Sequence, residues 1–346
     1  MIVEPTFGYW KSIDIIDRID KPIIITMKEP WAILKPKISN IPSQVIFNSS
    51  MDTKYLEELY FSLRKTIDDS ETIIGIGGGT SCDTAKYLSW KSHDQDDIHI
   101  NLILIPSIIS VDAFLCSSIA IRKKNKVNYI GESEPNEIII DFELIKKAPK
   151  YLNRAGVSDT ISITSALGDW KIAHEEKDEK LDKRVFDQAK SIAENLMKAR
   201  EDIQYINDNG IKALVNGFYN EVKLCEEWGN SRPEEGSEHF LAYCIESITK
   251  KHYIHGQIIG LNILISLYLQ EQYAEFSLEK IHRFFNDIKL DINPKSMNLS
   301  NEVLKKAIKK VKNYVMKENL MYSVYNSSKL DLDKNIRNLM RFIKSI

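Results

Sequence analysis

The chain has 346 residues, which corresponds to about two domains at roughly 150 residues per domain. It carries 47 Lys and Arg against 49 Asp and Glu, a net charge of −2, so it lacks the basic excess that binding to a nucleic-acid backbone usually requires. A hydrophobic share of 43% with only 14 Gly and 10 Pro excludes collagen-like, low-complexity and wholly disordered chains.

Export and membrane insertion are not expected from the sequence. The N-terminus has no basic region followed by an apolar run, which a secretory signal would need. The longest uncharged apolar stretch, residues 258–269, is too short to cross a bilayer as a helix and indicates a buried core helix. The four cysteines form no CxxC pair. We therefore expect a cytoplasmic protein with reduced thiols and no membrane contact.

Up to about residue 145, short runs rich in β-branched residues alternate with polar or helical stretches such as 52–66. Runs that are apolar at nearly every position are typical of a parallel sheet covered on both faces, so the pattern predicts an α/β first domain. A basic turn, RKKNK, divides two strand-like pieces in 117–131 and predicts a hairpin. The predicted strands are residues 21–27, 43–48, 72–77, 100–106 and 137–141.

Beyond about Tyr151 the pattern changes to longer helical periods, which predicts an all-α second half. We place the domain boundary near Pro149, giving domains 1–150 and 151–346. The mixed-sign charged run at 174–184 is expected to be a solvated helix end or loop. The predicted helices are residues 158–174, 183–200, 210–228, 237–250, 256–273 and 301–315.

The strongest local signal is TIIGIGGGTSCDTAKYL at 72–88, where an apolar strand runs into three glycines and then a helix. Without a Cβ, Gly77, Gly78 and Gly79 let backbone N–H groups approach a pyrophosphate at the positive end of the helix. Thr80 and Asp83 also match a helix-capping box. The segment meets neither the dinucleotide fingerprint nor the P-loop pattern, and a tight turn without a ligand is the alternative.

A second loop, PSIISVD at 106–112, follows the predicted strand 100–106. Ligands of open α/β sheets gather at the carboxyl ends of the strands, so its hydroxyls and the carboxylate of Asp112 could touch a cofactor and a substrate. Pro, Ser and Asp also favour turns by themselves, which is the plainer interpretation.

Three further polar residues stand in the helical half. Asp159 lies near a helix start, His239 lies in GSEH, and His255 opens the apolar helix. One carboxylate and two imidazoles can hold a divalent metal that keeps positions open for substrate. Their spacing is not a recognisable metal motif. The ordinary explanations are a helix-start carboxylate for Asp159 and a surface or core position for each His, and spacing alone favours them.

Taken together and in this order, these segments resemble the iron-containing alcohol dehydrogenase superfamily, most of all its sn-glycerol-1-phosphate dehydrogenase and glycerol dehydrogenase branch. The resemblance covers most of the chain. Its motifs are GIGGGTSCDTAK, PSIISVD, IIIDFELIKKAP with RAGVSDTIS, NSRPEEGSEHFLAY and YIHGQIIG.

The resemblance implies a dehydroquinate synthase-like fold: a Rossmann-like α/β nucleotide-binding domain, then an all-α metal- and substrate-binding domain, with the active site between them. It assigns a divalent metal to Asp159, His239 and His255, with zinc expected and nickel, iron or manganese as alternatives. Asp112 and Asp159 become catalytic residues that also face the substrate. NAD or NADP is assigned to Gly77, Gly78, Gly79, Thr80, Ser81, Asp83, Ser107, Ser110, Cys116 and Asn48.

Some positions depart from the pattern of the resembled branch. Tyr243 stands where a substrate-contacting His is usual, and Cys116 replaces a Ser near the nicotinamide. Asn48 falls where the adenosine ribose is read, and its neutral side chain does not exclude NADP. Arg232 is a candidate phosphate partner, with a structural ion pair as the open alternative.

The resemblance thus implies a metal-dependent NAD(P)-linked polyol dehydrogenase acting on glycerol 1-phosphate and dihydroxyacetone phosphate, with glycerol and dihydroxyacetone as the rival pair. A dehydroquinate or inosose synthase-like lyase is a further alternative, although its substrates need several cations near the metal, where the sequence supplies only Arg232 and His252 besides the ligands. A non-catalytic nucleotide-binding relative is the third. We expect a homo-oligomer.

Overall fold

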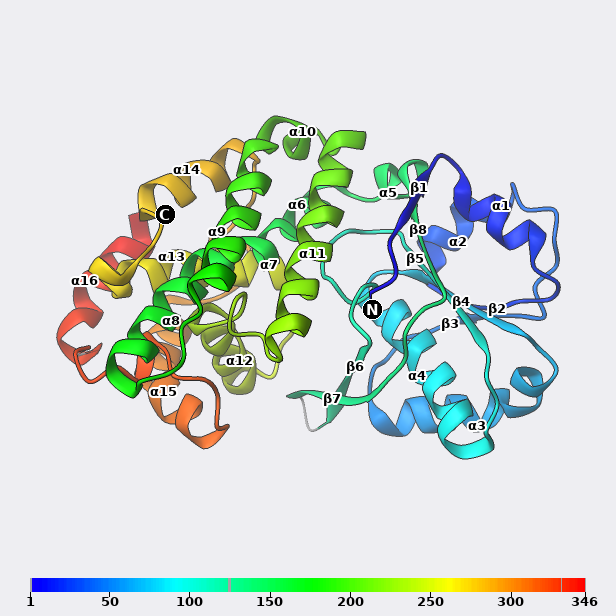
Figure 1. Ribbon diagram of the computed structural model, residues 1–346, viewed down its shortest axis with the longest axis horizontal. Coiled ribbons are helices and arrows are strands. Elements are labelled where there is room, and N and C mark those ends of the chain that lie inside the picture. The colour runs from blue at the N-terminus through cyan, green and yellow to red at the C-terminus, as the bar shows by residue number, and fades with distance from the viewer. Residues whose placement is uncertain (1, 124–125, 331, 346) are drawn as a thin grey trace. The chain divides into compact units, whose positions relative to one another are not determined.

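The computed structural model describes residues 2–123, 126–330 and 332–345, without the side chains of Lys126, 332–334 and Ser345. The chain divides into two compact units, residues 1–153 and 154–346 (Figure 1). The first unit is built on a parallel sheet, and the described part of the second is helical. No helix of the described residues is long and apolar enough to cross a membrane.

The first unit contains a six-stranded sheet in the order β1-β8-β5-β4-β2-β3, in which every paired neighbour is parallel. All five predicted strands are present, and the sheet gains β1 at one edge. β3 lies on one side of β2, whereas β4 and then β5 lie on its other side. The direction in which successive strands are added therefore reverses between β2 and β4. The strands are β1 Thr6–Gly8, β2 Ile23–Thr26, β3 Gln44–Phe47, β4 Thr72–Gly77, β5 Asn101–Pro106 and β8 Glu137–Asp141.

Helices cover both faces of this sheet, as the continuous apolar strands predict (Figure 1). On one face, a buried cluster joins isoleucines of β2, β4, β5 and β8 to Ile15 and Ile16 of α1 and to Trp31 and Leu34 of α2. On the other face, α4 lies directly on β4 and β5 and packs against α3. The helices of this unit are α1 Lys11–Arg18, α2 Lys28–Leu34, α3 Thr53–Asp68, α4 Gly79–Asp96 and α5 Phe142–Lys147, with α6 Lys150–Ala155 crossing the boundary.

The predicted hairpin is also present as two antiparallel strands, β6 Ser118–Lys123 and β7 Lys126–Glu132. The two central turn residues, 124 and 125, lie outside the described residues. Lys86 of α4 is completely buried and donates from Nζ to the carbonyl oxygens of Cys116 and Ser118. This ammonium group therefore fixes the start of the hairpin to the helix that follows the glycine turn.

The second unit is built around the apolar helix α13, whose side chains are buried along nearly its whole length, as predicted for 258–269. Its helices are α7 Val157–Ile161, α8 Ile163–Lys177, α9 Lys183–Lys198, α10 Arg200–Tyr205, α11 Asp208–Trp228, α12 Ser237–Thr249, α13 His255–Gln270, α14 Leu278–Asp287, α15 Asn301–Lys317 and α16 Leu332–Ser345, with short 3-10 turns at Glu271–Tyr273 and Val324–Asn326. The predicted helix 158–174 is divided at Ser162 into α7 and α8, and α10, α14 and α16 were not predicted.

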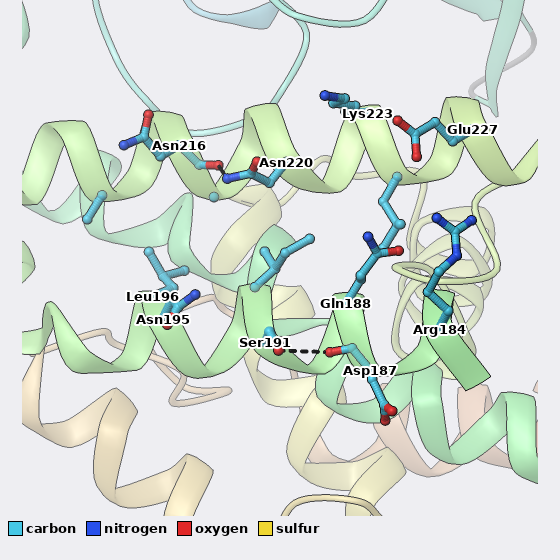
Figure 2. A pocket seen from close by; sticks show the side chains of 14 residues that line it. Arg184, Asp187, Gln188, Ser191, Asn195, Leu196, Asn216, Asn220, Lys223 and Glu227 are labelled. Atoms are coloured by element: carbon cyan, nitrogen blue, oxygen red, sulfur yellow. Dashed lines mark hydrogen bonds between the residues drawn. The ribbon is translucent and has the colours of Figure 1, made fainter. Parts of the chain in front are cut away.

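A groove lies between α9 and α11 and encloses about 820 Å³ (Figure 2). Its walls carry amide side chains, among them Gln188, Asn195 and Asn220, together with Arg184 and Glu227. None of the predicted site residues lines it. The groove is therefore separate from the groups considered below.

Candidate functional site

The structure brings Asp159, His239 and His255 together within the second unit. Each offers one ligand atom, and these atoms all lie within 4.8 Å of one another. His255 Nε2 is 3.0 Å from Asp159 Oδ1, and the two imidazole rings are 5.3 Å apart between centroids. Asp159 and His239 are buried, whereas His255 is partly exposed, so the group can be approached from one side. This is the geometry that a divalent metal with open coordination positions needs.

Close helix packing explains why residues so distant in sequence meet. Asp159 lies in α7, His239 is the third residue of α12, and His255 is the first residue of α13. A Cβ on Gly256 would lie 1.7 Å from the carbonyl oxygen of Ala155, so only glycine lets α13 begin against the segment that precedes α7. The contact sets His255 directly beside Asp159.

The donor atoms fit a cation. Asp159 Oδ1 is buried and has no hydrogen-bond partner of good geometry, although His255 Nε2 lies 3.0 Å away and a buried carboxylate oxygen normally has such a partner. A metal held by this oxygen and the two imidazoles would supply that partner. Carboxylate and imidazole ligands accept zinc, nickel, iron or manganese, so the residues are consistent with a divalent site and do not select its ion.

Glu238 holds His239 in place. This carboxylate is fully buried, and its Oε1 lies 2.9 Å from His239 Nδ1 while it accepts the N–H of Gly236 at 2.6 Å. Its Oε2 accepts the hydroxyl of Ser165 at 2.7 Å. With Nδ1 engaged by Glu238, the other ring nitrogen, Nε2, is the one left to bind a metal.

The surrounding charges make this site attractive to a cation. Burial by itself lowers the pKa of His239, but the hydrogen bond to Glu238 and the negative charges of Glu235, Glu238 and Asp159 outweigh burial and raise the pKa to about 9. Behind the site, burial and the charge of Glu238 raise the pKa of Asp169 to about 6, while the N–H groups of Ser237 and Val324 counteract them. Sequence reasoning missed Glu238 and Asp169 because their roles depend on hydrogen-bond partners.

The glycine turn and the second loop lie next to each other in the first unit. Gly77 pairs with Pro106 in the β4–β5 register, and Ser107 donates its N–H to the carbonyl of Gly77 at 2.9 Å. A Cβ on Gly77 would lie 2.3 Å from Ser81 Oγ, so glycine is required there. A Cβ built on Gly78 would have no atom within 4 Å, so the space beside this residue is open. Gly78 is also the N-cap of α4, which therefore has no capping side chain. The first-turn N–H groups of α4 therefore face a position open to an anion.

The capping box expected at Thr80 and Asp83 is wrong. The strand ends at Gly77 as predicted, but α4 begins at Gly79 with Gly78 as its N-cap, so Thr80 lies inside the helix. The carboxylate of Asp83 forms an ion pair with Lys86 at 2.8 Å instead. Burial raises the pKa of Asp83, and the charge of Lys86 opposes that effect.

Two predicted cofactor residues have structural hydrogen bonds. The Asn48 amide donates to Thr80 O at 3.2 Å and to Thr84 Oγ1 at 2.9 Å, and its oxygen accepts from Ser81 Oγ at 3.4 Å. These bonds give buried Asn48 and Ser81 a role in fixing α4. Their contacts to a nucleotide stay predictions.

The other predicted residues of the first unit lie in the second loop and at its end. The thiol of Cys116 donates to Asp112 Oδ2 at 2.8 Å, which links the predicted substrate carboxylate to the position near the nicotinamide. Ser110 and Asp112 are half-buried, and Ser107 is buried. Their roles as cofactor and substrate contacts stay predictions.

The structure corrects the prediction of Arg232 as a phosphate partner. Its side chain is only 1% exposed, and Nε and Nη2 each donate to one carboxylate oxygen of Glu179 at 2.7 Å. Nη1 donates to the carbonyl of Tyr322 at 2.9 Å. The alternative, a structural ion pair, is the one found, and Glu179 belongs to the charged run that was expected to be solvated.

Tyr243 lies one helical turn beyond His239, with the ring centroids 6.1 Å apart. Its hydroxyl donates to Glu235 Oε1 at 2.8 Å. Sequence reasoning identified Tyr243 but missed Glu235. The only signal in the sequence was an acidic residue in the loop before α12.

Comparison with known proteins agrees with this arrangement. The family "Iron-containing alcohol dehydrogenase" matches residues 37–149. The glycerol-1-phosphate dehydrogenase of Staphylothermus marinus is 26% identical over 286 residues, 79% of this chain and 78% of that protein. The enzyme of the same name from Sulfolobus acidocaldarius is 30% identical over 244 residues, 69% of this chain and 65% of that protein.

Solved structures share the fold over the whole chain. A probable glycerol dehydrogenase from Sinorhizobium meliloti 1021 superposes with a TM-score of 0.74 at 15% identity, covering 100% of this chain and 99% of that one. The glycerol dehydrogenase of Schizosaccharomyces pombe gives a TM-score of 0.70 at 18% identity, covering 100% of this chain and 90% of that one.

Fold and site together define a dehydrogenase scaffold, with a parallel sheet and glycine turn in one unit and a carboxylate–imidazole metal group in the other. Residues 37–149 match the iron-containing alcohol dehydrogenase family, and more than three quarters of the chain is similar to glycerol-1-phosphate dehydrogenases.

Proposed function

We propose that the protein is a metal-dependent, NAD(P)-linked polyol dehydrogenase that interconverts glycerol 1-phosphate and dihydroxyacetone phosphate. The observation that carries the proposal is the group of Asp159, His239 and His255, whose ligand atoms converge within 4.8 Å around an unsatisfied buried carboxylate oxygen. The similarity to glycerol-1-phosphate dehydrogenases supports this choice of substrate.

A metal bound by these three residues would polarise the substrate oxygen and favour its alkoxide near neutral pH. The residues of the chain do the rest. Asp159 and the two imidazoles hold the cation, and Glu238 keeps His239 in the ring orientation that binding requires. Reduction then needs a hydride at the carbonyl carbon and a proton at its oxygen, and oxidation reverses both transfers.

The nucleotide is assigned to the other unit. The N–H groups at the start of α4 and the hydroxyls of Ser107 and Ser110 are suited to phosphate oxygens, and Gly78 leaves room for close approach. Asp112 would orient substrate hydroxyl groups through its carboxylate. NAD and NADP both remain candidates, because no acidic residue stands at position 48 to repel a 2′-phosphate.

One observation favours the rival pair, glycerol and dihydroxyacetone. The guanidinium of Arg232, the cation expected to receive a phosphate, is bound to Glu179 and Tyr322. A phosphorylated substrate must therefore be held by other groups.

The test measures oxidation of NADH and NADPH by zinc-loaded protein, with dihydroxyacetone phosphate and dihydroxyacetone side by side and Asp159→Ala as the control. A preference for the phosphorylated ketone that disappears in the control supports the proposal. A preference for dihydroxyacetone supports the rival pair, and the absence of turnover with either ketone refutes both.

A further inference from the structure

Glu235 and Tyr243 form a fixed pair beside the metal-ligand group. The Tyr243 hydroxyl donates to Glu235 Oε1 at 2.8 Å. The other carboxylate oxygen, Oε2, accepts from Ser231 Oγ at 2.9 Å, and the Glu235 N–H donates to the Ser231 carbonyl at 2.7 Å. Because both carboxylate oxygens and the backbone are engaged, Glu235 is held in one position.

This pair determines the hydrogen-bonding character of the phenol. A tyrosine hydroxyl has one hydrogen to donate, and an ionised carboxylate can only accept. The single hydrogen of Tyr243 is therefore directed to Glu235, and toward any other group the phenolic oxygen acts as an acceptor. The surface formed by Glu235 and Tyr243 consequently accepts hydrogen bonds and carries a negative charge.

The pair lies where a small substrate would extend from the metal group. His239 and Tyr243 are four residues apart on α12, which places them on the same face of the helix. Their ring centroids are 6.1 Å apart, so both rings border the same short stretch of the helix surface. The hydrogen bond from Tyr243 places Glu235 Oε1 2.8 Å from the phenol on this face of α12.

The local charges distinguish between the two ends of a phosphorylated ketone. Asp159, Glu235 and Glu238 contribute carboxylates, and the guanidinium of Arg232 is already bound by Glu179. A phosphate dianion offers only acceptors and negative charge, so it is disfavoured against this surface. A hydroxymethyl group donates a hydrogen bond and carries no charge, so it is favoured there.

We propose that Glu235 is a positioning residue that orients Tyr243 as a hydrogen-bond acceptor, so that the pair binds the unphosphorylated hydroxymethyl end of the substrate and keeps a phosphate group away from that side. This inference rests on the proposed function. It applies to both candidate ketones, since dihydroxyacetone phosphate and dihydroxyacetone each carry a hydroxymethyl group next to the carbonyl.

The test compares dihydroxyacetone phosphate with hydroxyacetone phosphate, which lacks only the hydroxyl assigned to Tyr243. We expect kcat/KM of the parent enzyme to be about tenfold higher for dihydroxyacetone phosphate than for hydroxyacetone phosphate. This ratio corresponds to the free energy of one good hydrogen bond. In Tyr243→Phe this preference falls to within about twofold. In Glu235→Gln it falls by about threefold, because the amide can donate to the phenol and release its hydrogen.

Tyr322→Phe is the matched control. It removes a similar hydroxyl-to-carboxylate bond, that of Tyr322 to Glu176 at 3.0 Å, from a tyrosine outside α12 and the metal group. Its substrate preference should equal that of the parent. Zinc affinity, measured by chelator competition, should stay within about twofold of the parent in Tyr243→Phe, since the metal ligands are untouched.

Three results would overturn the inference. Equal losses of kcat/KM on both phosphorylated ketones would give Tyr243 a purely structural role, and so would the same change of preference in Tyr322→Phe. A zinc affinity more than tenfold weaker in Tyr243→Phe would show that the pair supports the metal group instead of the substrate. Failure of the parent to reduce either candidate ketone would refute the proposed function itself, which separates the two failures.

Discussion

Replacing Arg232 by methionine tests whether this buried guanidinium stabilises the fold or binds substrate. Methionine retains much of the apolar volume and removes the charge and the three hydrogen bonds to Glu179 and Tyr322. Hydrogen bonds to charged groups contribute about 1.5–3 kcal/mol each at most. Glu179 is 34% exposed and can be rehydrated, so we expect a loss of about 3 kcal/mol in the free energy of unfolding.

For a unit of this size, that loss lowers Tm by about 6–12 °C in calorimetry. The KM for dihydroxyacetone phosphate at 25 °C should remain within about twofold of the parent, because the side chain does not reach substrate. Arg200→Met is the control, since its ion pair with Asp287 spans 3.8 Å between exposed groups and should contribute less than about 0.5 kcal/mol. An unchanged Tm together with a KM raised tenfold would refute the structural role and restore Arg232 as the phosphate partner.

Three further predictions follow from the second unit. Glu238→Gln keeps the shape that supports His239 but removes the charge, so zinc affinity measured by chelator competition should fall about 10–100-fold; an unchanged affinity would contradict the role of Glu238. Gly256→Ala should destabilise the protein by about 3 kcal/mol and abolish zinc binding, because its Cβ would meet the Ala155 carbonyl; a variant that melts and binds zinc like the parent would refute this packing. Burial raises the pKa of Glu176, but hydrogen bonds from Ser327, Ser328 and Tyr322 outweigh burial and lower it to about 2, so its stabilisation is complete above pH 4.5 and is lost as the pH falls toward 2. The difference in unfolding free energy between Glu176→Gln and the parent, about 1 kcal/mol at pH 6 after solvent screening, should therefore disappear near pH 2, and a constant difference would contradict it.

The sequence predicts most of the fold because continuous apolar strands and long helical periods are strong local signals. All five predicted strands occur, whereas β1 has only three residues and gave no pattern. The capping box at Thr80 was wrong because an [ST]-x-x-[DE] spacing does not reveal that the helix begins before Thr80, at Gly79, with Gly78 as its N-cap.

The site residues also differ in whether the sequence near them reveals their role. Asp159, His239 and His255 were assigned by resemblance, since their spacing of 80 and 16 residues is not a metal motif. Glu235 and Glu238 were missed because only their hydrogen-bond partners reveal what they do. The choice between the two interpretations of Arg232 depended on Glu179, which lies 53 residues away and looked solvated.

The central claim is that Asp159, His239 and His255 hold one divalent cation on which ketone reduction depends. The most direct measurement titrates metal-free protein with zinc while NADH oxidation by dihydroxyacetone phosphate is followed and bound zinc is counted. We expect activity to rise from baseline and to saturate at one zinc per chain, with neither binding nor activity in His239→Ala. Full activity of the metal-free protein, or stoichiometric zinc binding that survives loss of His239, would contradict the account.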